Sequence, residues 1–491
     1  MVSTVFIWIL IGAYLLLVAG TVLVVLLENR QPERTIAWVV ALVLLPVVGL
    51  VVFYFFGQNI RHRQRLRRHK KKRKQTAANL STEKRASHLE AYSRLKESAE
   101  RSTEVSENQH ISLQHLCAEA FNAPVQPLEG ALLLDNGTDF LTALLRAFSK
   151  AKKYIYLETY IIENDSIGNL VADALADAAQ RKVEVRLLYD DVGCWRVPER
   201  FFRALERRGV RTAAFMPVRF PSLTHKINYR NHRKLCVIDG TIGFIGGMNL
   251  ALRYMGREGF IWRDMHLSIQ GAAAGRLESI FLDDWAIVTR DEKISKKHCE
   301  STTFQPISDN STVQIVTSDP KTAVPQLMYA YTWAAMHARR YLYVQTPYFM
   351  PTEPFLQALK TAAMSGTDVR VMMPRKPDGI MLRRINDSYI AELLAAGIRV
   401  YLYEGGFLHS KCIAADDHWC AVGSANMDFR SFLNNIEVGA LIYDAATCAA
   451  VRDRFERDMK SCSGIDANRW AQRGLMRRLL ESATRILSPL F

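Results

Sequence analysis

Two stretches of the chain carry the same polar residues at the same internal spacing. The downstream copy, HSKCIAADDHWCAVGSAN, contains His409, Lys411, Asp416, Gly423, Ser424 and Asn426. The upstream copy, HRKLCVIDGTIGFIGGMN, contains His232, Lys234, Asp239, Gly246, Gly247 and Asn249. A single match of this kind is a weak signal. Two copies that agree in His, Lys, Asp and Asn, with a small-residue pair before the Asn, indicate a duplicated functional site.

The local sequence of each copy indicates what that site could do. Apolar runs at Leu235–Ile238 and Cys412–Ala415 predict a strand, followed by a second strand or a tight turn. Residues two apart on a strand face the same side, so each copy presents its His and Lys together. A neutral imidazole beside a fixed cation suits attack on phosphorus. Asp239 and Asp416 have the opposite parity, which predicts a supporting role within the motif.

Two acidic residues complete the candidate site. Asp264 follows His232 in the sequence WRDMH, and Glu437 follows His409 in NNIEVG. A carboxylate that accepts the second ring N–H would fix the tautomer of each histidine. The order in the chain pairs Asp264 with His232 and Glu437 with His409. An ordinary ion pair or a surface carboxylate is the alternative.

The elements that must position these residues are themselves repeated. Residues 151–160 match residues 338–347, and 183–188 match 368–373. Each half alternates helix and strand three times before it reaches its His-Lys stretch, which predicts an α/β fold with mostly parallel, buried sheets flanked by helices. We place the first half at 127–305 and the second at 306–465. Packed together, the two halves could bring their His-Lys strands to one cleft.

Length and composition agree with two such halves. A chain of 491 residues exceeds what one simple core usually supports, and 49% of the residues are hydrophobic. The eight cysteines are dispersed, with no close Cys-x-x-Cys pair and no His-rich metal spacing. We interpret them as reduced thiols and expect neither a structural zinc ion nor a cofactor.

The N-terminal region has the composition of a membrane hairpin. Val5–Leu27 and Ile36–Phe56 are uncharged apolar stretches of 23 and 21 residues, which predicts two membrane-spanning helices within residues 1–60. A buried soluble hairpin is the alternative. The net charge of +15 is concentrated in residues 61–74, where ten of fourteen residues are Lys or Arg. This run predicts a cytoplasmic location for both the N-terminus and the rest of the chain. It could also attract anionic lipids, and we expect no nucleic-acid partner.

Three further segments have less distinct signals. Residues 61–126 comprise the basic run and a polar, helical linker. Residues 215–229 are an apolar and basic insertion, either a rim loop or a segment that touches the bilayer. Residues 466–491 predict an amphipathic C-terminal helix with leucines on one face and arginines on the other. That helix could lie in a membrane interface or pack on the domain.

The duplicated motif resembles that of the phospholipase D superfamily. The two apolar stretches with their QPERT loop, the NHRK form of the first motif and the terminal RILSPLF are similar to bacterial cardiolipin synthases. The resemblance covers almost the whole chain. It implies a duplicated phospholipase D-like domain with one active site shared by both halves and no metal. It also implies a multi-pass protein of the inner membrane with its catalytic domain in the cytoplasm.

The resemblance also implies a mechanism. His232 would attack the phosphorus of phosphatidylglycerol while His409 protonates the departing glycerol, giving a phosphohistidine. His409 would then activate a hydroxyl of a second phosphatidylglycerol, which yields cardiolipin. The phosphate oxygens would be held by Lys234, Lys411, Asn249 and Asn426, and the histidines oriented by Asp264 and Glu437. The roles of the two histidines could be reversed.

Other activities fit the same residues. A hydrolytic phospholipase D or a phosphatidylserine synthase would use the same constellation with water or serine as acceptor. A membrane-tethered nuclease and an inactive scaffold are further alternatives. The apolar N-terminus favours a lipid acceptor, and the intact His, Lys and Asn residues argue against a scaffold.

Overall fold

The structure is a computed structural model that describes residues 2–27, 32–45, 47, 49–50, 53, 110–218, 228–256, 261–290, 311–322 and 324–490. The basic run at 61–74, much of the predicted linker and most of the 215–229 insertion lie outside these residues. Contacts divide the chain into two compact units. One consists of residues 1–79, 218–229 and 320–324, and the other contains the remainder.

The first unit contains helices α1 (Val2–Leu27) and α2 (Pro32–Leu44), which pack against each other. A small apolar cluster of Val25, Leu42 and Phe53 lies between them. Most of the other described apolar side chains of α1 and α2 are exposed. No helix within the described residues is long and apolar enough to cross a membrane. The prediction of two membrane spans is therefore not confirmed.

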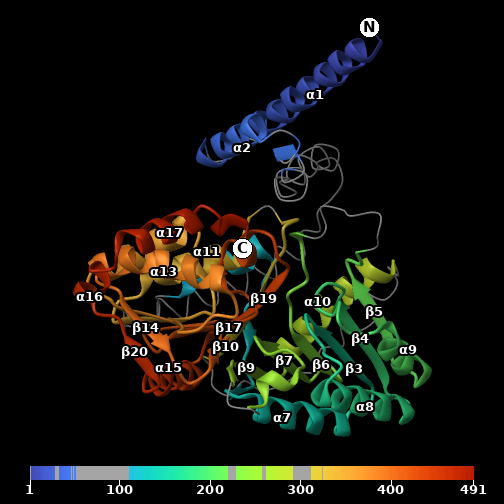
Figure 1. Cartoon of the computed structure of the whole chain (residues 1–491). Helices are drawn as coiled ribbons and strands as arrows, with labels where there is room; N and C mark the ends of the chain where they lie inside the picture. Colours follow the sequence, from blue (N-terminus) through green and yellow to red (C-terminus); the bar gives the residue numbers. More distant parts are fainter. Residues whose placement is uncertain are drawn as a thin grey trace, which may run out of the picture. The chain divides into compact units, whose positions relative to one another are not determined.

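The first half of the second unit is built on one sheet (Figure 1). Its strands, in spatial order, are β2 (Gly130–Leu134), β9 (His266–Gln270), β7 (Ile242–Gly246), β6 (Leu235–Ile238), β3 (Tyr154–Thr159), β4 (Glu184–Asp190) and β5 (Arg211–Phe215). Its outer face is covered by α7 (Gly137–Lys150), α8 (Ser166–Gln180) and α9 (Glu199–Arg207). Asn136 and Asp165 cap the N-termini of α7 and α8, respectively, by accepting backbone N–H groups.

The second half repeats this arrangement. Its strands, in spatial order, are β1 (Gln126–Pro127), β10 (Thr312–Ser318), β19 (Glu437–Tyr443), β17 (Trp419–Gly423), β16 (Cys412–Ala415), β11 (Tyr341–Gln345), β13 (Asp368–Pro374), β14 (Arg399–Tyr403) and β20 (Cys462–Gly464). The outer face carries α6 (Ile111–Phe121), α11 (Gln326–His337), α12 (Glu353–Met364) and α13 (Ile380–Ala395). Although it lies in the predicted linker, α6 packs on α11 and β10 and buries Leu113, Cys117 and Phe121.

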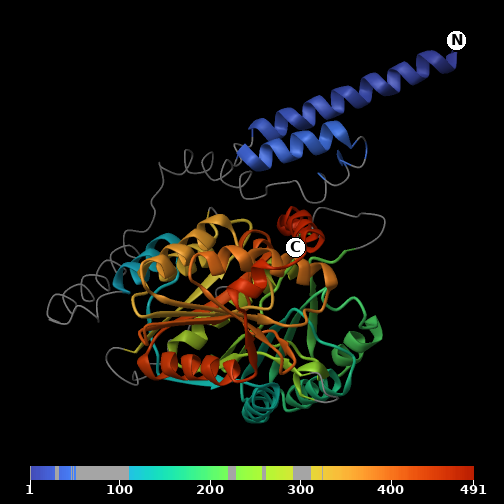
Figure 2. The same ribbon diagram turned by 60° about the vertical axis from the view of Figure 1, so that its left-hand side comes forward.

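Helices α10 (Ala272–Thr289) and α15 (Ala445–Met459) lie on the inner sides of the two sheets. Figures 1 and 2 show α15 on the side of the second sheet opposite to α13. A single apolar core joins buried residues of both sheets to Phe281 of α10 and Phe455 of α15. The two halves therefore share one core, which fixes their relative position.

The strand directions correct one prediction. Only β3–β4–β5 and β11–β13–β14 pair in parallel among the main sheets of the described residues, and their other neighbours pair antiparallel. Helical crossovers produce the parallel pairs, as the helix–strand alternation predicted. The His-Lys strands β6 and β16 instead turn back directly into β7 and β17, and hairpins are antiparallel. The sheets are thus mixed and mostly antiparallel.

The motif aspartates hold these hairpins to the neighbouring strand. Asp239, at the β6–β7 turn, accepts backbone N–H groups of Lys152, Lys153 and Tyr154 at 2.8 Å each. Asp416 accepts the equivalent N–H groups of residues 339–341 at 2.7, 2.8 and 2.9 Å. Their carboxylates thus anchor the starts of β3 and β11. These bonds agree with the supporting role predicted from the parity of Asp239 and Asp416, and a catalytic role for either aspartate stays a prediction.

The C-terminal segment forms separate short helices where one amphipathic helix was predicted. They are α16 (Ala467–Ala471), α17 (Leu475–Arg485) and the 3₁₀ turn η5 (Ser488–Leu490). Gly474 stands at the N-cap of α17, and the chain between α16 and α17 leaves the helical conformation. Helix α17 packs on α13.

Candidate active site

The two motif histidines enter their strands from equivalent positions. His232 precedes β6 and His409 precedes β16, and their side chains are 11% and 8% exposed, respectively. Tyr160 lies edge-on to His232 with a centroid distance of 4.8 Å. Trp262 lies 5.0 Å from His409 by the same measure. Each imidazole is therefore held in a nearly closed, partly aromatic pocket.

Each histidine is bonded to a carboxylate of the opposite half. His232 Nδ1 lies 3.0 Å from Glu437 Oε1, and His409 Nδ1 lies 2.5 Å from Asp264 Oδ2. The pairing predicted from the order in the chain is therefore wrong. Asp264 orients His409 and Glu437 orients His232. Both carboxylates are fully buried.

Backbone pairing between the halves explains the exchange. The short strand β8 (Trp262–Arg263) runs parallel to β15 (Phe407–Leu408), and the His409 N–H donates to the Arg263 carbonyl at 2.7 Å. Asn231 forms a matching parallel bridge with Ile436, where the His232 N–H donates to the Ile436 carbonyl at 2.8 Å. Each histidine thus lies alongside the segment of the other half that carries the carboxylate.

These bonds set the state of the rings. With Nδ1–H donating to a carboxylate, Nε2 is the nitrogen left for a substrate. Burial lowers the pKa of His232 below its ordinary value, although Glu437 opposes this. Burial, together with the Lys411 charge, lowers the pKa of His409 to about 3. Both imidazoles are therefore neutral at neutral pH in the empty site, which is the form required of a nucleophile or base.

The carboxylates stay ionised despite their burial. Burial acts to raise the pKa of Asp264, but the charge of Lys411 and the interaction with the His409 ring outweigh it and hold that pKa below its ordinary value. The pKa of Glu437 is lowered in the same way, against burial, by His232, Lys234 and a hydrogen bond from Ser424. The site therefore holds fixed negative charge behind each ring, where it stabilises an imidazolium when one forms.

The motif lysines lie beside their own histidines. Lys234 Nζ donates to the His232 carbonyl at 2.7 Å and lies 5.1 Å from the Tyr160 ring centroid. Lys411 Nζ donates to the His409 carbonyl and lies 3.8 Å from Asp264 Oδ2. An ammonium has three N–H donors, so each lysine retains donors for an anion. Burial lowers the pKa of Lys234 to about 7 and that of Lys411 to about 8.

The motif asparagines differ between the copies. Asn249 Oδ1 accepts the Ile161 N–H at 3.1 Å, and its Nδ2 donates to the Tyr254 hydroxyl at 2.8 Å. Asn426 is buried, and its side chain bonds Asp428, whose pKa burial raises to about 6. The amide of Asn249 is thus engaged in positioning at both ends, so the contact of the asparagines with phosphate stays a prediction.

The small-residue pair after each strand has a steric explanation. A Cβ on Gly247 would lie 2.2 Å from Asp264 Oδ1, so only glycine fits there. The equivalent Ser424 donates its hydroxyl to Glu437 Oε2 at 2.5 Å and accepts the Val438 N–H at 3.0 Å. Gly247 therefore leaves room for the Asp264 carboxylate, whereas Ser424 donates a hydrogen bond to the Glu437 carboxylate.

Sequence analysis missed the buried arginines behind the carboxylates. Arg233 pairs with Asp284 of α10 and donates to the Glu437 carbonyl at 3.2 Å. Arg263 pairs with Asp458 of α15 at 2.9 Å and donates to the Asp264 carbonyl at 2.5 Å. Both arginines adjoin predicted site residues in the sequence, but their partners on distant helices leave no signal in spacing.

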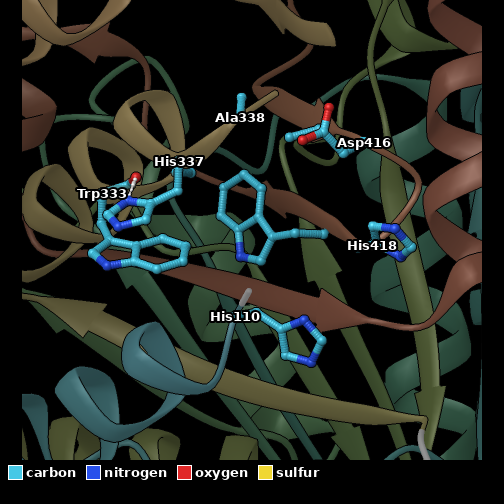
Figure 3. Close-up of a pocket in the computed structure, with 9 residues that line it drawn as sticks. His110, Trp333, His337, Ala338, Asp416 and His418 are labelled. Carbon is cyan, nitrogen blue, oxygen red and sulfur yellow. Dashed lines mark hydrogen bonds between the residues drawn. The ribbon is translucent and has the colours of Figure 1, made fainter. Parts of the chain in front are cut away.

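A further cavity lies at the far end of β16. Figure 3 shows His110, Trp333, His337 and His418 around it, and Asp416 on its rim. Its volume of about 30 Å³ is room for roughly one water molecule. No group of His, Cys, Asp or Glu residues in the part of the chain that the structure describes is arranged to hold a metal ion. This cavity is separate from the two motif histidines.

Known protein families and relatives match the parts of the chain that carry both motifs. The family described as "Cardiolipin synthase, PLD-like domain" matches residues 144–285 and 333–459. The family described as "Phospholipase_D-nuclease N-terminal" matches residues 15–58. The cardiolipin synthase of Halalkalibacterium halodurans is 36% identical over 98% of this chain and 94% of its own length. The cardiolipin synthase 2 of Bacillus anthracis is 35% identical over 95% of this chain and 88% of its own length.

The chain belongs to the cardiolipin synthase family. This membership confirms the family and the phosphatidyltransferase class predicted from the sequence. The crystal structure of a phosphatidylserine synthase of Haemophilus influenzae covers 77% of this chain and 100% of its own, with a TM-score of 0.60 and 14% identity. That likeness supports the duplicated phospholipase D-like fold.

The exchanged pairing makes a prediction about individual histidines. In Asp264→Asn, His409 loses its charged partner and should change its tautomer and titration, while His232 keeps the signals of the parent protein. Nitrogen NMR of histidine-labelled protein measures both rings. Glu437→Gln is the matched control and should alter His232 alone. We expect turnover to fall by about 10²–10⁴ in either variant, as for loss of a histidine-orienting carboxylate. A response of His232 to Asp264→Asn would contradict the pairing.

The lysines predict an alkaline limit to activity. As pH rises through about 7 to 8, Lys234 and Lys411 lose their charge in the empty site and with it their attraction for an anionic substrate. Above that range kcat/KM should fall by up to about tenfold per pH unit for each lysine that loses its charge. In Lys234→Arg the guanidinium stays charged, so the alkaline fall in kcat/KM should begin at a higher pH. The exposed Lys460→Arg serves as control, and a fall that begins at the same pH in all three proteins would contradict this assignment.

Proposed function

We propose that this cardiolipin synthase transfers a phosphatidyl group between two phosphatidylglycerol molecules through a phosphohistidine on His232. Both motif histidines are bonded through Nδ1 to a buried carboxylate of the other half. The observation that carries the proposal is that they share one site, since the Lys411 charge acts on His232 and the Lys234 charge acts on His409. Two imidazoles with Nε2 available in one site meet the needs of a double displacement, which requires a nucleophile and a separate proton carrier.

In the first step, His232 Nε2 forms a bond to phosphorus and the bond to the glycerol oxygen breaks. The departing oxygen takes a proton from His409. In the second step, His409 accepts the proton of a hydroxyl on the second phosphatidylglycerol. That oxygen bonds to phosphorus, the bond to His232 breaks and cardiolipin forms. Because the bonds made and broken are alike, the transfer is reversible.

The environments of the two histidines support this division of roles. Asp264 lies 2.5 Å from His409, close enough to stabilise an imidazolium strongly. Glu437 lies 3.0 Å from His232 and also accepts hydrogen bonds from Ser424 and Asn435, so its bond to the ring is the longer of the two. The pKa of His409 is low in the empty site, but an anionic phosphodiester beside the ring favours the protonated form.

We propose further that α1 and α2 hold the enzyme at the bacterial inner membrane as a multi-pass hairpin, with the catalytic unit in the cytoplasm. Exposed apolar side chains along both helices support this, among them Phe6, Trp8 and Leu16. The basic run at 61–74 follows directly in the sequence and suits the cytoplasmic face.

Labelled phosphatidylglycerol tests the reaction. Purified protein should release free glycerol and form cardiolipin, resolved by thin-layer chromatography, and His232→Ala and His409→Ala should each abolish the product. Rapid quenching into alkali and peptide mapping should place the label on His232. Phosphatidic acid as sole product would mean hydrolysis, and label on His409 would reverse the assigned roles.

Membrane fractions test the hairpin. The full-length protein should stay in the membrane pellet after an alkaline carbonate wash, because a spanning hairpin is held by apolar burial and not by charge. Proteolysis of intact spheroplasts should leave the catalytic unit uncut, and opening the cells should expose it. Release by carbonate would contradict the spans.

A further inference from the structure

Helix α17 docks with its charged face inward. Helix α17 packs against α13. Its buried residue is Glu481, which is only 3% exposed. An amphipathic helix of a globular protein usually buries its apolar side. The orientation of α17 is the reverse, so its apolar side is presented outward.

Ion pairs hold the charged face in place. Arg477 lies 3.0 Å from Asp387 and Arg485 lies 2.8 Å from Glu392, both on α13. Glu481 accepts from Arg477 at 2.9 Å. The Arg485 guanidinium also lies 4.1 Å from the Tyr389 ring centroid. Several partly buried pairs and a cation–π contact fix the helix more firmly than one exposed pair would.

The outward face is apolar. Leu475, Met476 and Ile486 are 70%, 70% and 78% exposed, and Leu479 and Leu480 are about half exposed. Their spacing places these side chains on one side of the helix. Exposed apolar patches of this kind mark contacts with a membrane or another protein.

Basic residues accompany this face. Arg478 of α17 and Arg383 of α13 are exposed, and Lys376 is exposed just before α13 begins. From Arg473 to Arg485 the chain has four arginines and one glutamate. Leucine and methionine flanked by arginine are the features of a helix that lies in the interface of an anionic bilayer. Three of these arginines pair with carboxylates, and Arg478 is the exposed arginine of α17 that accompanies the apolar face.

The segments that adjoin α17 reach the neighbourhood of the second motif. The turn η5, which follows α17, packs on α14 (Phe429–Leu433), and α14 begins shortly after Asn426. At the start of α13, Asp378 accepts the Tyr348 hydroxyl at 2.8 Å, and Tyr348 neighbours Phe407 next to His409. A bilayer held against α17 would therefore lie close to the chain segments that frame His409.

We propose that α17 is an interfacial docking helix, which lies in the headgroup region of an anionic bilayer with its leucines toward the acyl chains. The docking does not depend on the reaction. Its consequence, that lipid substrates reach the site from the surface on which α17 rests, depends on the proposed function.

Photocrosslinking tests the docking without activity. Full-length protein with p-benzoylphenylalanine at Met476 is reconstituted in vesicles that contain labelled phosphatidylglycerol. The control position is Glu456, an exposed residue of α15 on the opposite side of the second sheet (Figure 1). We expect at least about tenfold more lipid adduct at 476 than at 456, as for a face buried in the interface. Equal yields, no adduct or crosslinking to a second copy of the chain would each overturn the proposal.

A charge on the apolar face tests the consequence. Leu479→Glu should lower cardiolipin formation from phosphatidylglycerol vesicles by roughly tenfold and leave activity in mixed detergent micelles unchanged, because micelles do not require docking. Leu170→Glu, at an exposed leucine of α8, is the matched control and should leave both activities unchanged. Equal losses in vesicles and micelles would overturn the role in lipid delivery. Absence of activity in every protein would refute the proposed function, while the crosslinking result would still decide the docking.

Discussion

The bond from each motif histidine to a carboxylate of the other half determines most of the architecture around the site. Asp264 and Glu437 are buried charges, and a buried carboxylate is costly unless nearby groups compensate it. The compensation comes mainly from the opposite His and the lysines. The halves must therefore meet in one register, and the β8–β15 ladder with the Asn231–Ile436 bridge provides it. The shared core and the inner helices α10 and α15 then fill the space between the sheets.

The duplication preserved shapes while it changed chemistry. Glu158, near the end of β3, accepts a hydrogen bond from Asn231 at 2.6 Å. Burial, together with the nearby Asp284, raises the pKa of Glu158. The equivalent Gln345 donates to Asp458 at 2.9 Å. Burial thus favours the protonated form of Glu158 at the position where the other half carries the amide of Gln345. The same principle applies around the histidines, where equivalent positions surround rings with unequal proton affinity.

Much of this could be predicted from the sequence, because repeats and periodicity are local signals. The two His-Lys strands, the helix–strand alternation and the opposite parity of the motif Asp residues can all be predicted from spacing. The exchange of Asp264 and Glu437 was not, since distance along the chain does not report which half a segment lies against. The antiparallel majority was missed because crossovers were counted and hairpins were not. The inverted docking of α17 was hidden for a related reason. The amphipathic pattern predicts that the helix has an apolar and a charged face, but it does not predict which face packs against the rest of the protein.

The exchanged pairs also bear on how the active site comes into being during synthesis. His232 and Glu437 are 205 residues apart in the chain, and His409 and Asp264 are 145 apart. While the ribosome is still making the second half, the first motif has emerged but its orienting carboxylate does not yet exist. The first half can form its sheet, but its histidine is without the partner that fixes the tautomer. Both histidines acquire their orienting carboxylates only when the two halves have closed around the shared core.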